Sequence, residues 1–433
     1  MVEFFQTKVL PAVMKFVTSK PVSAIKDGMV ATMSLTIIGS IFLLLVFFPY
    51  QPVADFFASS GLAPFMMQAF SATFNILALV VAFTIAYSYA HHAKVEALGC
   101  GIISMVSFIL LSNNTVAGFD STGAATQIGG VIPLSDMGSR GMVAAIIVGL
   151  VVGSIFTWFV SRGITIKMPA GVPQGVANAF ITLIPGAVII VLMAIVYGTF
   201  RSFGNTTFID FIYKVIQTPL QGLTDSFGGV IFISMLVPIL WWFGVHGNSI
   251  VGGVMGGLWT ANTLANQQLF EAGKLTISNG GHIAATQFNA LLVTMTGSGL
   301  TIGIVLTMLF FAKSKQFKEL GRLSIGSALF NINEPITFGT PIVLNPFLLI
   351  PFVLVPTVAA AVAYIAMWTG LVPLFSGINP PWTTPPIISG FIAGGWRMAA
   401  LQVVLIVISF VGYYPFVMKV DKDNLKAEQE AGE

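Results

Sequence analysis

Glu334 is the acidic residue best placed to do chemistry, because it lies in an apolar stretch, residues 325–346, that asparagine, glycine and proline interrupt. The other acidic residues of this 433-residue chain fall in loops, tails and amphipathic connectors, or at the ends of apolar segments. Removing a carboxylate from water is costly unless it is paired or protonated. The position is therefore typical of a binding or proton-transfer site. The structural alternative is a carboxylate satisfied by the backbone amides of its own turn.

A histidine and a tryptophan in the same half of the chain could act with this carboxylate. His246 follows an aromatic run at the end of an apolar segment, where it could serve a site or simply pack. Trp382, between Pro381 and Thr383, fits a rigid aromatic platform. The apolar face of a sugar ring stacks on such a platform, while its hydroxyls need amide, carboxylate or imidazole partners. The alternative for Trp382 is a tryptophan at the membrane interface.

The remaining residue types favour a neutral, hydroxyl-rich solute. Arg397 is the only basic residue in the apolar part of this half that an anion could use. The sequence has no His/Cys cluster, P-loop or Rossmann glycine pattern, so neither a metal nor a cofactor is expected. Cys100 adjoins an apolar run and is interpreted as a buried thiol. His282 lies in a loop rich in glycine and asparagine, and no function is expected there.

The elements that position these residues must cross a membrane. Charged residues make up 8% of the chain, against about 25% in soluble proteins. Such a chain could not cover a soluble surface, and it lacks the basic stripe of a nucleic-acid-binding protein and the polar composition of a disordered one. One cysteine excludes a disulfide scaffold. Continuous apolar runs exclude a β-barrel, so the predicted fold is an all-α polytopic membrane protein.

Nine apolar segments are long enough to span a bilayer. They fall at 29–49, 66–90, 96–112, 142–160, 179–199, 227–245, 289–312, 347–369 and 397–418. Most lysines and arginines lie in the N-terminal segment, at 91–95, 161–178 and 313–323, and in the C-terminal tail. Since basic loops face the cytoplasm, both termini are expected there. Nine crossings cannot satisfy this arrangement, so residues 248–268 are predicted to form a tenth.

The spans divide the chain into two halves. Residues 1–28 are predicted to form an amphipathic interfacial helix, with its helical part at 3–26 and a bend at Pro11. A regular helical half at 29–199 would provide a scaffold and dimer interface, and an amphipathic connector at 200–226 would lead to a transport half at 227–418. A cytoplasmic tail occupies 419–433. In the transport half, 325–346 and 373–390 are too rich in proline for regular spans, so reentrant, cavity-lining segments are expected there.

Three stretches resemble the enzyme IIC component of bacterial phosphotransferase-system sugar transporters, in the lactose/cellobiose/chitobiose family. The first is Gly321-Arg322-Leu323 followed by Phe330-Asn331-Ile332-Asn333-Glu334-Pro335-Ile336-Thr337-Phe338-Gly339-Thr340-Pro341. The second is Trp242-Phe243-Gly244-Val245-His246-Gly247, which resembles the histidine motif of the family. The third runs from Lys167-Met168-Pro169 to Val172-Pro173, with Ile184-Pro185, and resembles an intracellular loop.

The resemblance implies a homodimer of ten-helix protomers in the bacterial cytoplasmic membrane. Each protomer would bind a β-linked disaccharide of the chitobiose or cellobiose type. A phosphocysteine on a cytoplasmic enzyme IIB, a separate polypeptide, would phosphorylate the 6-hydroxyl. Motif matching places the family's sugar-binding glutamate at Glu334 and its histidine at His246, and either could assist as a general base. Trp382, Asn248 and Asn333 are assigned to substrate binding by their neighbourhood.

Two other functions remain open from the residues alone. In a secondary sugar–cation symporter, Glu334 would carry the coupling proton. In a dimeric structural or receptor protein, the same site would bind without transport. Neither alternative accounts for the three matching stretches.

Overall fold

The computed structural model describes residues 18–48, 50–119, 124–169, 171–204, 206–244, 246–340 and 342–430, together with Pro11 and Lys15. The predicted helix at 3–26 and its bend at Pro11 therefore lie mostly outside the described residues. Only the end of that segment is seen, where α3 begins at Lys20 with a proline in its first turn.

The first half consists of helices and one hairpin. Its elements are α3 (Lys20–Ala31), α4 (Met33–Val46), α5 (Gln51–Ser59), α6 (Ala63–Phe74), α7 (Leu77–His92), α8 (Leu98–Leu110), β1 (Thr115–Phe119), β2 (Ala125–Gly129), α9 (Leu134–Met137), η2 (Ser139–Gly141), α10 (Met142–Ser161) and α11 (Gln174–Gly204). The antiparallel strands pair Thr115 with Gly129. The all-α prediction missed this hairpin, whose short strands carry little hydrophobic signal.

The second half is also helical, with more interruptions. Its elements are α12 (Phe208–Ile212), η3 (Tyr213–Gln217), α13 (Thr218–Thr224), α14 (Phe227–Trp242), α15 (Gly247–Glu271), η4 (Ile277–Asn279), α16 (Thr286–Phe288), η5 (Asn289–Val293), α17 (Ile302–Phe310), α18 (Lys315–Leu329), α19 (Glu334–Gly339), α20 (Pro346–Trp368) and α21 (Ile388–Glu430). Helices α14 and α20 are apolar along nearly their whole length, as expected of helices packed in protein or lipid.

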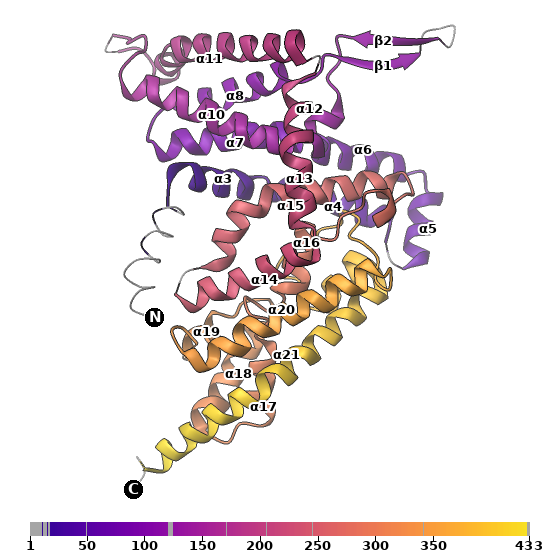
Figure 1. The fold of residues 1–433 in the computed structure, drawn as a ribbon, viewed down its shortest axis with the longest axis vertical. Helices are drawn as coiled ribbons and strands as arrows, with labels where there is room; N and C mark the ends of the chain where they lie inside the picture. The colour runs from indigo at the N-terminus through magenta and orange to yellow at the C-terminus, as the bar shows by residue number, and fades with distance from the viewer. Residues whose placement is uncertain are drawn as a thin grey trace.

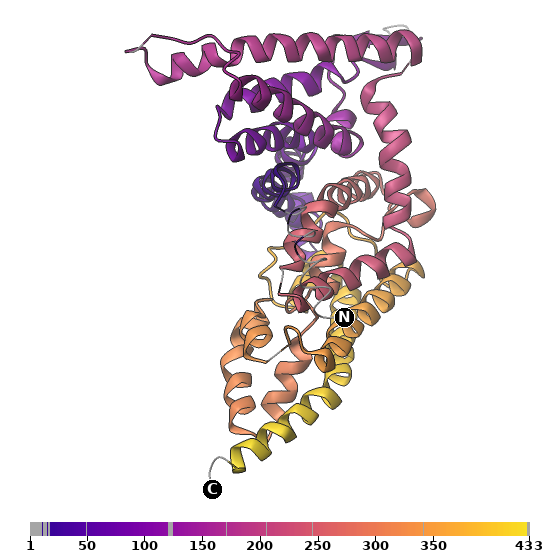
Figure 2. The same ribbon diagram turned by 60° about the vertical axis from the view of Figure 1, so that its left-hand side comes forward.

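Two hydrophobic cores occupy the two ends of the molecule (Figures 1 and 2). One core is built mainly from residues 24–212 and the other from residues 230–417. Helix α15 lies between them: its Val251 and Trp259 belong to the second core, and its Ala261 and Leu264 to the first. The two cores thus meet near the connector at 200–226. That residues 227–418 move as a unit stays a prediction.

The described residues contain six helices long and apolar enough to cross a membrane, or seven if the bent pair Phe208–Thr224 and Phe227–Trp242 forms one span. The protein is therefore polytopic and helical. The predicted stretch 248–268 is a single helix, α15, with Asn262, Asn266 and Gln267 fully buried. Its amides face protein, as expected for a polar segment among apolar ones.

The predicted continuous span at 289–312 is wrong. The π-turn η5 ends at Val293, and α17 begins only at Ile302. Between them Thr296, Gly297, Gly299 and Leu300 adopt positive φ values, which no helix tolerates. Apolar flanks hid this break, because hydropathy does not separate one long helix from two short ones joined by a buried loop.

The connector is helical, as predicted, but its apolar residues do not share one face. Ile212 is 5% exposed, whereas Val215 is 55% exposed. The π-helical turn η3 adds a residue to the turn and so rotates the face between α12 and α13. The figures show this connector running from the first half to the second.

The two proline-rich stretches are interrupted, as predicted. Residues 330–333 separate α18 from the short α19, and residues 340–345 separate α19 from α20. No helix lies between Trp368 and Ile388, a stretch described throughout. Helix α21 then bends at Gly394 and Gly395 and continues through the predicted tail as far as Glu430.

Candidate functional site

Glu334 begins the six-residue helix α19 and is partly exposed. Pro335 favours this position, because proline is accommodated in the first turn of a helix, where its missing N–H is not needed. The helix packs on α18, where Gly339 approaches Leu320 so closely that a Cβ would lie 2.6 Å from its methyl group. The Glu334 carboxylate thus lies at the start of a short helix that packs against α18.

The turn before Glu334 is fastened to the loop between η5 and α17. Asn331, with φ of 65°, accepts a hydrogen bond from the Thr296 amide at 2.7 Å. Asn333 is 3% exposed and donates from Nδ2 to the Ser298 carbonyl at 2.7 Å. Gly297 is required beside it, since a Cβ there would meet the Asn333 side chain at 2.2 Å.

Trp382 is brought to the same turn through its backbone. Its carbonyl and that of Thr384 accept hydrogen bonds from Asn331 Nδ2, at 2.5 and 3.0 Å. The Trp382 residue remains 52% exposed. The structure therefore places the backbone of a half-exposed tryptophan next to the segment that carries Glu334.

His246 caps helix α15 and is linked to α19 by an aromatic contact. Its Nδ1 accepts the Ser249 amide at 3.2 Å, and its ring lies 4.5 Å from Trp241. Trp241 in turn meets Phe338 of α19 edge-on at 6.4 Å. Because Nδ1 holds the cap, Nε2 is the ring atom left to meet a substrate.

Asn248 is the second residue of α15, with its Oδ1 buried and without a hydrogen-bond partner among the described atoms. Trp241 Nε1 and Thr340 Oγ1 share this condition. Buried polar atoms normally have partners. Asn248 lies two residues after His246, and Thr340 directly follows α19. No described contact joins Asn248 to Trp382 or Glu334. His246 is linked to α19 through Trp241, and the Trp382 backbone is linked to the turn before Glu334 through Asn331.

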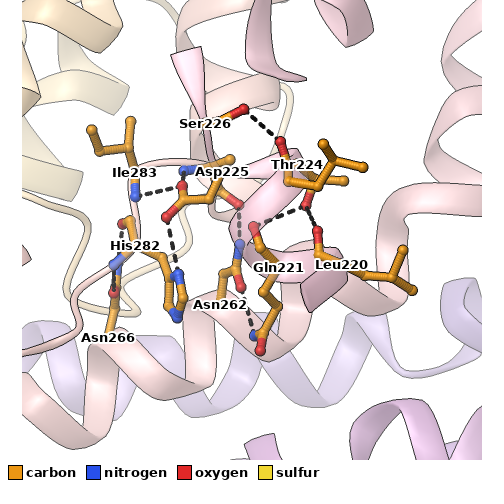
Figure 3. Close-up of polar contacts among 11 residues, drawn as sticks. Leu220, Gln221, Thr224, Asp225, Ser226, Asn262, Asn266, His282 and Ile283 are labelled. Carbon is orange, nitrogen blue, oxygen red and sulfur yellow. Dashed lines mark hydrogen bonds and ion pairs between the residues drawn. The ribbon is translucent and has the colours of Figure 1, made fainter. Parts of the chain in front are cut away.

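Sequence reasoning missed Asn331, although it belongs to the same stretch as Glu334. A signal was available, since asparagine is among the few residues that readily take a left-handed conformation. The reasoning also missed a polar cluster on the connector. There Asp225 accepts hydrogen bonds from the Ile283 and Ala284 amides and pairs with His282 Nδ1 at 3.0 Å (Figure 3).

The same cluster contains buried amides that join the connector to α15. Gln221 donates to Asn262 Oδ1 at 2.7 Å, and Asn262 donates to the Ala284 carbonyl at 2.8 Å. Asn266 exchanges two hydrogen bonds with the backbone of His282 (Figure 3). These groups satisfy one another, so the cluster is a structural joint, and His282 serves there.

The apolar helices, the interrupted segments and the polar site between them define a multi-pass membrane permease. The sequence model described as "Phosphotransferase system, EIIC" matches residues 26–356. This chain belongs to that family. It is an enzyme IIC permease of the phosphotransferase system, in the cellobiose/chitobiose group of bacterial sugar transporters.

Similar proteins match along nearly the whole length. The lichenan permease IIC component of Bacillus subtilis (strain 168) is 41% identical, covering 99% of this chain and 95% of that protein. The cellobiose-specific EIIC component of Geobacillus stearothermophilus is 39% identical, covering 99% and 96%. The crystal structure of the transporter ChbC, the IIC component from the N,N'-diacetylchitobiose-specific phosphotransferase system, matches with a TM-score of 0.92 and 38% identity, over 98% of this chain and 99% of that one.

Proposed function

We propose that this protein takes up a β-linked disaccharide of the chitobiose or cellobiose type and presents its 6-hydroxyl to a phosphocysteine of a separate enzyme IIB. The names of the similar proteins support this sugar class. The observation that carries the proposal is that contacts through Trp241 and Asn331 tie His246 and the Trp382 backbone to the segment that carries Glu334. A carboxylate, an imidazole nitrogen and an aromatic face suit a polyhydroxylated ring.

Glu334 and His246 hold the 6-hydroxyl end of the sugar. Either can accept the hydroxyl proton as the oxygen attacks phosphorus and the cysteine sulfur leaves. Alignment contributes more than proton transfer, since phosphoryl transfer depends mainly on positioning and charge stabilisation. Trp382 stacks on a sugar ring. Asn333 acts through the loop that it holds, because its Nδ2 is committed to Ser298, and Asn248 offers its unpartnered Oδ1.

The arrangement in the membrane completes the proposal. Ten crossings place both termini in the cytoplasm, with α15 as the polar tenth crossing. Two copies associate through the first half, and the bilayer covers the remaining apolar faces. Helix α11 supports such an interface, because Val191, Ile195 and Phe203 are 58, 60 and 90% exposed in the single chain. The second half, residues 227–418, then moves the sugar.

Glu334→Gln tests the proposed chemistry, because it keeps the shape of the side chain and removes its charge. The protein is reconstituted in vesicles with enzyme IIB and the phosphoenolpyruvate-dependent donors, and phosphorylation of cellobiose and diacetylchitobiose is measured. We expect the variant to lose about 100-fold in rate. The matched control is Glu319→Gln on α18, an exposed carboxylate paired with Arg322, which should leave the rate unchanged.

The same vesicles separate the proposal from a sugar–cation symporter. Uptake by the proposed transporter stops when phosphoenolpyruvate or enzyme IIB is withheld and continues when the ion gradient is collapsed. A symporter shows the opposite dependence. Normal phosphorylation by Glu334→Gln would contradict the assigned role of the carboxylate.

A further inference from the structure

One side chain joins the three non-helical segments of the site. Asn331 accepts the Thr296 amide with Oδ1 and donates from Nδ2 to the carbonyls of Trp382 and Thr384. An amide suits this place, because it combines an acceptor and a donor group in one planar unit. Its left-handed φ of 65° directs it away from the helix that precedes it.

The Thr296 end of this bridge is rigid. Tyr413 donates to the Gly299 carbonyl at 2.6 Å, and Ser409 Oγ donates to the Leu300 carbonyl and accepts the Gly303 amide. Thr296 itself is fully buried. The loop between η5 and α17 is therefore a fixed point, to which Asn331 attaches the next segment.

The Trp382 end is a turn closed by one backbone hydrogen bond, from the Thr384 amide to the Pro381 carbonyl at 2.9 Å. It lies between α20 and α21, where no helix or strand provides regular hydrogen bonds. The residue is half exposed, and none of the ring contacts found among the described residues includes it. The position of the Trp382 ring is thus set through its backbone. Asn331, which lies three residues before Glu334, holds that backbone.

We propose that Asn331 is a positioning residue that fixes the Trp382 ring relative to the Glu334 carboxylate. The inference rests on the proposed function, in which the ring stacks on one part of the sugar and the carboxylate holds another. A disaccharide that must touch both groups then depends on the length and direction of the Asn331 bridge. Asn331 acts through Trp382 and does not itself need to touch the sugar.

Asn331→Asp tests the bridge with a side chain of the same shape. The aspartate keeps an acceptor for the Thr296 amide, but its second oxygen cannot donate and repels the two carbonyls. We expect binding of cellobiose and diacetylchitobiose, measured by calorimetry on the full protein, to weaken about tenfold. The KM for phosphorylation should rise similarly while kcat at saturating sugar stays within about twofold, since the Glu334 end is intact.

A second variant and a control guard against a folding defect. Asn331→Gly keeps the left-handed backbone at no steric cost and removes all three side-chain hydrogen bonds, so it should show the same loss of binding. Asn279→Asp changes an exposed asparagine whose Nδ2 contacts the Lys274 carbonyl, and it should bind sugar normally.

The double variant Asn331→Asp/Trp382→Ala decides the issue. If Asn331 acts through the ring, its replacement has no further effect once the ring is gone, and the double variant binds as Trp382→Ala does. Multiplied losses, or normal binding by Asn331→Asp and Asn331→Gly while Trp382→Ala is impaired, would overturn the inference alone. Normal binding by Trp382→Ala would overturn the proposed role of the ring and the inference together.

Discussion

Replacing Asp225 with alanine should destabilise the second half of the protein more than replacing it with asparagine. Asp225 Oδ1 accepts the amides of Ile283 and Ala284, and Oδ2 pairs with His282 (Figure 3). The Asp225 side chain is 17% exposed, so water replaces it poorly. Alanine leaves two backbone donors without an acceptor, whereas asparagine keeps the oxygen for both amides and replaces the charged partner of His282 with a neutral amide nitrogen.

The structure sets the size of both effects. A buried donor left unsatisfied costs about 1–3 kcal/mol, and the partial exposure favours the lower half of that range. Two donors then give about 3 kcal/mol for Asp225→Ala, and the weaker neutral acceptor gives about 1 kcal/mol for Asp225→Asn. In a folding unit of about 200 residues these values lower Tm by about 6–12 °C and 2–4 °C.

Thermal unfolding in detergent, followed by intrinsic fluorescence at one scan rate, measures the difference. Asp55→Ala is the control, because this exposed carboxylate meets only the Gln51 side chain. It should melt within about 1 °C of the parent, in keeping with the small effects of surface substitutions. Equal melting of Asp225→Ala and the parent, or of Asp225→Ala and Asp225→Asn, would refute the reasoning.

Three further predictions concern other buried polar groups. Burial raises the pKa of Asp136. The stability that the protonated carboxyl contributes is therefore present at low pH and is lost as pH rises through that pKa. Asp136→Asn should flatten the profile of Tm against pH, and an unchanged profile would contradict this. Asp421→Ala should lower Tm by about 5 °C or more, since this residue, 1% exposed, accepts the amides of Lys313 and Ser314 just before α18; equal melting of variant and parent would count against it. Tyr413→Phe should cost about 1 kcal/mol in urea unfolding, because the Gly299 carbonyl loses its donor, and a midpoint equal to the parent's would show that the bond contributes nothing.

Local sequence predicted the interrupted backbone around Glu334 well, since proline and asparagine act on the residues beside them. It failed at 294–301, where the loop is stabilised by Asn331, Ser409 and Tyr413, far along the chain. No window of neighbouring residues contains these partners. The glycines at 297 and 299 were the available local signal, and they were outweighed by apolar flanks.

Burial of charge was the least predictable property. Glu334 was singled out as the acid within an apolar stretch, yet it is partly exposed, while Asp136 and Asp421 are each 1% exposed. Position in an apolar window does not determine depth, which depends on how distant helices pack. The candidate site residues therefore rest on motif and chemistry, whereas the bridge through Asn331 required the three-dimensional arrangement.

Helix α21 is the last described helix to leave the ribosome, and this order constrains biogenesis. Its Gln402 donates to the Leu291 carbonyl, Ser409 and Tyr413 hold the 294–301 loop, and Asp421 holds Ser314, the N-cap of α18. All of these partners are synthesised before α21, so their contacts cannot form until α21 has been made. The first half, whose core comes mainly from residues 24–212, can mature during translation. A nascent chain that stops before residue 402 would therefore hold most residues of the first core but lack the contacts that α21 makes to the second half.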